Sequence, residues 1–69
     1  MQREQKIIVE CIERAGELIE RYDANRLRAI KASNVERAQG WASHVARETA
    51  YVERLSGHLA ALRGEGAQR

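Results

Sequence analysis

Hydrophobic residues recur along the chain with the period of an α-helix. In the first half, an alternating spacing of four and three residues places them on one side of a helix. This stripe consists of Ile8, Ile12, Ala15, Ile19, Tyr22, Arg26 and Ala29, and Cys11, Leu18 and Ile30 widen it. The opposite side is charged, and Glu10 with Arg14 and Glu17 with Arg21 have the i, i+4 spacing that favours ion pairs. The pattern predicts an amphipathic helix over residues 3–31.

The second half repeats this pattern. Its seam consists of Ala38, Trp41, Val45, Glu48, Val52, Leu55, Leu59 and Leu62, and only Glu48 interrupts the apolar positions. The pattern predicts a second helix over residues 34–63. The remaining residues, 64–69, contain two glycines and no apolar side chain larger than alanine, so we expect a disordered tail.

The segment between the two stripes has the signature of a capping box. The Ser33 hydroxyl can accept a hydrogen bond from the Glu36 amide while the Glu36 carboxylate reaches back. This predicts a tight turn at about residues 32–33. Asp23 offers an alternative N-cap that would divide the first helix near Ala24 and give three helices, but no glycine or proline marks a break there.

These elements make one all-α domain, residues 1–69, built as an antiparallel two-helix hairpin. A chain of 69 residues with a single cysteine has no internal disulfide to support a small core. Two helices also leave much of such wide stripes uncovered, so we expect a homodimeric four-helix bundle. The predicted dimer core consists of Ile8, Ile12, Ala15, Ile19, Tyr22, Val45, Glu48, Val52, Leu55 and Leu59.

Glu48 is the polar residue of the second seam, and two interpretations are open. It could be a buried acid or a metal ligand together with His44, or a carboxylate hydrogen-bonded to the Tyr22 hydroxyl or to an arginine. We favour the second, because metal sites in helical bundles use several inward carboxylates. We therefore expect no metal and no cofactor.

No other residues form a catalytic set. Cys11 lies on the apolar side of the first helix, where a thiol behaves as a small hydrophobic group. We interpret His44 and His58 as solvated. Glycines are isolated within the helices, as at Gly16, which indicates either close helix approach or simple tolerance. We expect no enzyme, no catalytic residues and no small-molecule substrate.

Charge is distributed unevenly, although the net charge is only +2. Basic residues gather around the turn, opposed there only by Asp23 and Glu36. This basic end could bind an acidic protein surface or nucleic acid, or it could be a solvated helix end. Arg26 should lie level with Trp41, either as a cation–π contact or as an anchor for an anion. The candidate partner-binding residues are Trp41, Arg26, Arg37, Tyr51 and Arg28.

The first thirty residues contain no apolar run longer than Ile7, Ile8 and Val9. We therefore expect neither a signal peptide nor a membrane span, and a cytoplasmic location.

In length and layout, and in the Ala38-x-x-Trp41 pattern, the chain resembles the small helical-hairpin regulators of plasmids and phages. Among these are the Rop-like RNA-binding bundles and the phage quorum-sensing anti-activators, which are dimeric hairpins that inhibit host proteins. The resemblance implies a phage or mobile-element protein that acts as a homodimeric inhibitor of a host or partner protein. The alternatives are a Rop-like RNA- or DNA-binding regulator that uses the basic turn end, and a structural subunit that pairs with a different chain.

Overall fold

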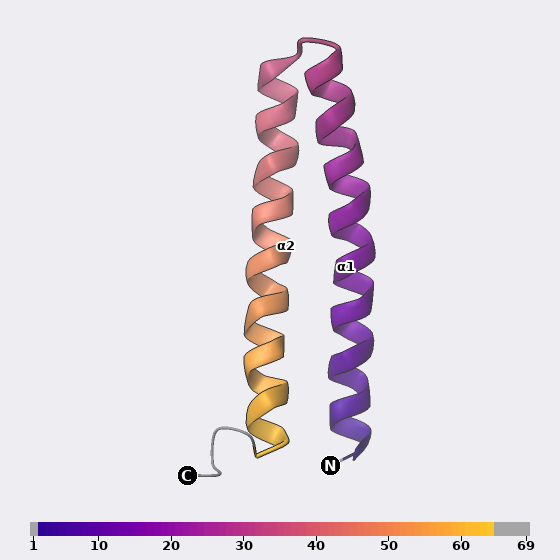
Figure 1. Ribbon diagram of the computed structural model, residues 1–69, viewed down its shortest axis with the longest axis vertical. Helices are drawn as coiled ribbons and strands as arrows, with labels where there is room; N and C mark the ends of the chain where they lie inside the picture. The colour runs from indigo at the N-terminus through magenta and orange to yellow at the C-terminus, as the bar shows by residue number, and fades with distance from the viewer. Residues whose placement is uncertain (1, 65–69) are drawn as a thin grey trace.

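The chain folds as a hairpin of two long antiparallel helices. The computed structural model describes residues 2–64, in which α1 spans Gln2–Lys31 and α2 spans Val35–Leu62. Figure 1 shows the two helices side by side along their whole length, joined by a short turn at one end. This confirms the prediction of an all-α helical hairpin, and each helix begins and ends within one residue of its expected bounds. Most of the predicted tail, residues 65–69, lies outside the described residues.

α1 is continuous, so the alternative of three helices is wrong. Asp23 does not cap a new helix. Its Oδ1 atom instead accepts a hydrogen bond from Arg26 Nε at 2.8 Å, and this is the only ion pair within residues 2–64. The i, i+4 pairs expected from Glu10 and Glu17 are therefore not formed. Exposed pairs of this kind contribute only a few tenths of a kcal/mol, because the entropic cost of holding two long side chains in place offsets most of their attraction in water.

The turn differs from the expected capping box. Ser33 has a φ of 58°, and its amide donates to the Ile30 carbonyl at 2.9 Å, while the Asn34 amide donates to the Ala29 carbonyl at 2.9 Å. These two bonds form a Schellman motif, which satisfies the last carbonyls of α1 and requires a left-handed residue at the position of Ser33. Ser33 therefore ends α1 and does not begin α2.

Asn34 caps α2 in place of Ser33. Its Oδ1 atom accepts a hydrogen bond from the Arg37 amide at 3.1 Å, as an N-cap side chain does for the third residue of a helix. The predicted capping box was therefore placed one residue too early. α2 ends at Leu62, and Gly64 follows with a φ of 77° and an amide that donates to the Ala61 carbonyl at 3.0 Å, which closes the last turn.

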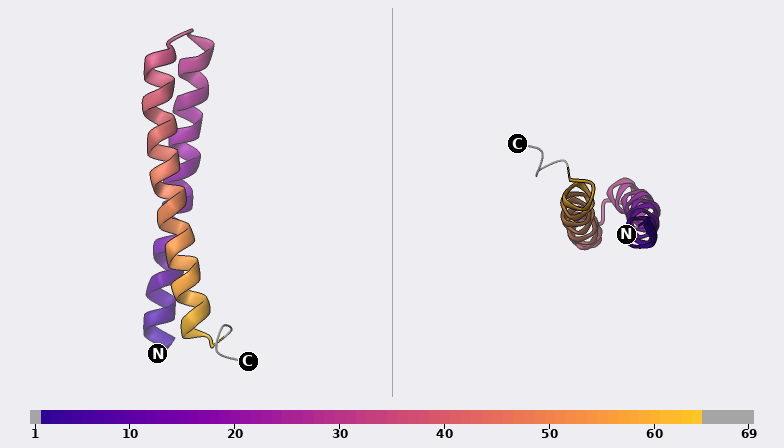
Figure 2. Two further views of the ribbon diagram at one scale, coloured as in Figure 1. Left: turned by 90° about the vertical axis from the view of Figure 1, so that its left-hand side faces the viewer. Right: turned by 90° about the horizontal axis from the view of Figure 1, so that it is seen from below.

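The core between the helices is thin. Only five hydrophobic side chains within the described residues are buried, and three of them are alanines: Ile8, Ala15, Ala29, Ala38 and Leu59. The other residues of the predicted dimer core are half-buried, namely Ile12, Ile19, Tyr22, Val45, Glu48, Val52 and Leu55. These side chains are only half-buried because the molecule is a single layer of two helices, as Figure 2 shows from below. Its shortest extent is 12 Å.

Several large apolar side chains remain in solvent. Val35 is 66% exposed, Ile7 53%, Ile30 51% and Leu27 48%. A Cβ atom added at Gly16 would meet no atom within 4 Å, so close approach between α1 and α2 does not explain this glycine. Neither helix contains a stretch that is long and apolar enough to cross a membrane.

Candidate partner-binding surface at the turn end

A groove lies beside the turn of the hairpin. It has a volume of about 360 Å³ and is lined by Asn25, Arg28, Ala29, Ala32, Asn34, Arg37 and Trp41. We call it the turn groove. The Schellman turn and the Asn34 cap hold its two walls together, because they fix the end of α1 against the start of α2. Three of the five predicted partner-binding residues, Arg28, Arg37 and Trp41, thus meet at one site.

The arginines of the turn groove carry uncompensated charge. Arg28 Nη1 donates to Asn25 Oδ1 at 3.1 Å, so a neutral amide holds its side chain along α1. Within residues 2–64 the only carboxylate in an ion pair is Asp23, and its partner is Arg26. Arg28 and Arg37 are both exposed, so the groove presents two guanidinium groups to solvent beside an indole ring.

Trp41 belongs to a cluster of three aromatic rings. Its ring stacks on Tyr22 with centroids 5.6 Å apart and an interplanar angle of 28°. His44 lies against both, 5.3 Å from Tyr22 and 5.5 Å from Trp41 between centroids. Such offset and tilted pairs are favourable beyond their buried area. The cluster links α1 to α2 and fixes the position of the indole beside the turn groove.

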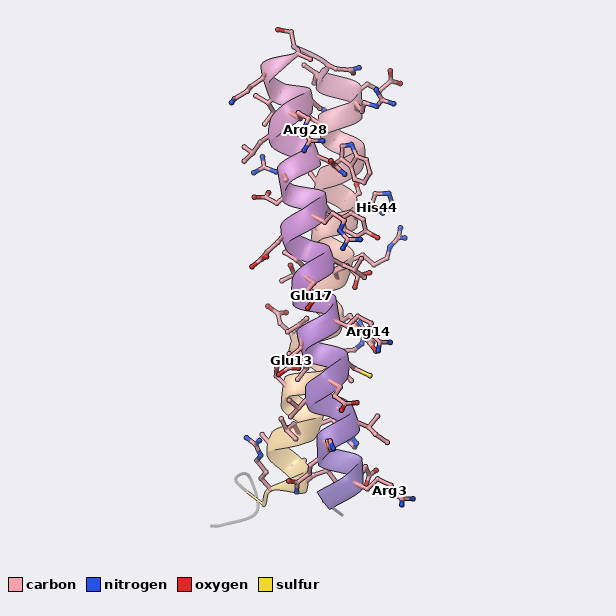
Figure 3. The ribbon with its side chains drawn as sticks, turned by 90° about the vertical axis from the view of Figure 1, so that its right-hand side faces the viewer. Arg3, Glu13, Arg14, Glu17, Arg28 and His44 are labelled. Carbon is pink, nitrogen blue, oxygen red and sulfur yellow. The ribbon has the colours of Figure 1, made fainter. Side chains whose placement is uncertain are left out.

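This cluster corrects the expectation for His44. His44 is exposed, as expected, but it contacts Tyr22 and Trp41 and is not simply solvated. Figure 3 shows it projecting from the same edge of the hairpin as Arg14. The contact between Trp41 and His44 could have been predicted from the sequence, because residues three apart on a helix lie on the same side.

The other two predicted partner-binding residues lie elsewhere. Arg26 does not stack on Trp41. It pairs with Asp23 and lines a second groove, with Ile30, Val35 and Ala42. Tyr51 is 36% exposed and lines a shallow hollow far from the turn, where the Arg54 guanidinium lies 6.0 Å from its ring centroid.

Glu48 lines the same shallow hollow as Tyr51, together with Cys11, Arg14 and Leu18. Neither of its expected partners is found, because the described residues show no hydrogen bond to Glu48 from Tyr22 or from an arginine. Its side chain is half-buried, so water can still reach it. In the described part of the chain, no three residues of the types His, Cys, Asp and Glu are grouped so as to hold a metal ion.

Comparisons of the chain with protein-family models, with curated proteins and with solved structures find no significant match. The site must therefore be interpreted from its own chemistry.

Proposed function

We propose that this protein is a small non-enzymatic regulator that acts as a homodimer and binds a partner protein through the turn groove. The observation that carries the proposal is the meeting of Trp41, Arg28 and Arg37 at one groove. Tryptophan and arginine are the residues most enriched at protein-binding hot spots. The resemblance to phage and plasmid hairpin regulators favours an inhibitor of a host protein.

The chemistry of the groove favours an acidic partner surface. Two unpaired guanidinium groups favour carboxylates, to which arginine can make two parallel hydrogen bonds. The indole supplies apolar contact area that needs little ordering, because the stack with Tyr22 already holds its ring. Loops or helix ends rich in Asp and Glu, with an apolar side chain for Trp41, have the matching character.

The proposal is tested by replacing the two groove arginines. The Arg28→Ala/Arg37→Ala variant should stay helical and lose at least about tenfold in capture of a partner from nuclease-treated host lysate, because hot-spot truncations cost this much or more. The matched control is Arg3→Ala/Arg47→Ala, which removes the same charge from exposed sites outside the turn groove. Figure 3 shows Arg3 at the opposite end of the hairpin from Arg28.

Equal capture by both double variants would contradict the proposal. A Trp41→Ala variant provides a second check, and it too should stay folded while it loses the partner. The nucleic-acid alternative is separated by its salt dependence, since phosphate contacts make affinity for a labelled RNA hairpin fall steeply between about 50 and 200 mM salt. The nucleic-acid alternative would be favoured if the protein binds the RNA hairpin tightly and in a salt-sensitive way and captures no protein from the lysate.

A further inference from the structure

One side of the hairpin is rich in aliphatic and small side chains that are half-buried or exposed. On α1 it follows the helical spacing of Val9, Ile12, Ile19 and Ile30, and on α2 that of Val35, Ala42 and Thr49. We call this surface the aliphatic face. A groove of about 280 Å³ lies at its turn end, where Ile30 and Val35 are more than half exposed.

The aliphatic face differs in charge from the side that carries the aromatic cluster. The groove on it has a single charged lining residue, Arg26, whose charge is balanced by Asp23 at 2.8 Å. The lining of the grooves on the aromatic side includes Arg14, Arg28 and Arg37, against one carboxylate, that of Glu48. Homodimer interfaces are more apolar than other protein surfaces and are depleted in unpaired charges. The aliphatic face therefore suits self-association, while the aromatic side suits a charged partner.

The surface area also calls for a second chain. The accessible surface is 5464 Å², whereas a compact protein of 7.8 kDa exposes about 4,400 Å². A standard interface buries about 800 Å² per partner, which would remove most of this excess. Gly16, near the middle of α1 on this face, has open space where its Cβ would lie. A helix of another chain could approach closely there.

We propose that a second copy of this chain covers the aliphatic face in antiparallel orientation, so that the two turn grooves lie at opposite ends of the dimer. The orientation follows from charge. Residues 21–49, the half with the turn, contain six basic and three acidic residues, whereas residues 2–20 and 50–64 contain five basic and six acidic. Antiparallel pairing places the basic half of one copy beside the weakly acidic half of the other, and it separates the two basic ends.

The proposal rests on the homodimer of the proposed function and specifies its interface. Thr49 lies near the middle of α2 on the aliphatic face and is exposed in the single hairpin. In the antiparallel two-fold dimer α2 lies opposite α2 of the other copy and Thr49 comes close to its own copy, so Thr49→Arg brings two guanidinium groups together. The variant should lose dimeric mass in light scattering at concentrations where the wild-type protein is dimeric. The matched control is Ser43→Arg, because Ser43 is an exposed residue of the same helix on the side away from α1. This variant should remain dimeric.

The orientation is measured separately. A spin label on Lys31→Cys, in a Cys11→Ser background, marks the turn end without entering the interface. Antiparallel pairing should give a distance between labels close to the 50 Å length of the hairpin, and parallel pairing a distance of roughly two helix diameters, about 20–25 Å.

A wild-type protein that is monomeric, or that is helical only with a different chain, would overturn the proposal, as would a dimeric Thr49→Arg variant or a short label distance. Failure of the proposed function looks different. In that case the Thr49→Arg and label results stand, and the Arg28→Ala/Arg37→Ala variant captures the partner as well as its control does.

Discussion

Ser33 has the left-handed backbone conformation that reverses the chain, and its side chain makes this conformation unfavourable. At φ 58° the Cβ atom of an L-residue crowds the following carbonyl, which costs about 1 kcal/mol. Glycine occupies this position in most Schellman motifs because it has no Cβ. The two hydrogen bonds from the amides of Ser33 and Asn34 hold the turn in place despite this strain.

Replacing Ser33 with glycine should therefore stabilise the protein. We expect the Ser33→Gly variant to gain a few tenths of a kcal/mol in free energy of unfolding, which remain of the strain of about 1 kcal/mol after the larger entropy of glycine in the unfolded chain is subtracted. Urea denaturation of both proteins at one concentration measures the difference. Ser43→Gly makes the same change inside α2, where it should instead cost roughly 0.5 kcal/mol. A loss of stability in the Ser33 variant would show that the serine relieves the strain in another way.

The misplaced cap shows what sequence reasoning could not decide at this scale. Ser33 and Asn34 are both good N-cap residues, and the helix preference of their neighbours does not distinguish them. The choice is made by the chain reversal, which requires one left-handed residue directly after α1. Once Ser33 takes that conformation, Asn34 is the first residue whose side chain can reach the free amides of α2.

At the scale of the helices, periodicity was enough to predict which positions face the partner helix. The eight seam positions of α2 are all buried or half-buried, including Glu48. Periodicity did not predict which side chains meet across the seam. Arg26 and Trp41 line different grooves, and Arg26 pairs with Asp23 whereas Trp41 stacks on Tyr22. A rotation of a helix smaller than the width of its apolar stripe decides such contacts, and a stripe about 100° wide cannot specify it.

The aromatic cluster should couple the two helices energetically. In a double-mutant cycle of Tyr22→Leu and Trp41→Leu, we expect an interaction free energy of about 0.5–1.5 kcal/mol, the usual value for a stacked pair. Chemical denaturation of the four proteins gives this value. The cycle of Tyr51→Leu with Trp41→Leu should give a value near zero, because Tyr51 lies in a separate hollow. Equal coupling in both cycles would mean that the stack contributes nothing specific.

For the whole molecule, the sequence predicted the hairpin and its uncovered stripe but not how that stripe is divided. The aromatic side and the aliphatic face come from two flanks of the same stripe, and only the packing of α1 on α2 separates them. Neither Val35 nor Leu27 belongs to the seams from which the core was predicted, and both are exposed.

Stability should therefore depend on protein concentration. If a second copy covers the aliphatic face, the melting temperature followed by circular dichroism should fall on dilution, since dissociation exposes the face again. Thr49→Arg should melt at a lower temperature that does not change with concentration, whereas Ser43→Arg should behave like the wild-type protein. A wild-type melting temperature that is constant over a hundredfold dilution would argue against self-association.

The turn also determines the order in which the chain can fold. Ala29 and Ala38, buried next to the turn, are close in sequence, whereas Ile8 and Leu59 at the other end are separated by most of the chain. The entropy lost on closing a loop grows with its length, so the pair at the turn forms at the lowest cost and each later pair builds on the one before it. The contacts between the helices should therefore form in order from the turn toward the chain ends. Folding of the hairpin then begins at Ser33, the strained residue of the turn.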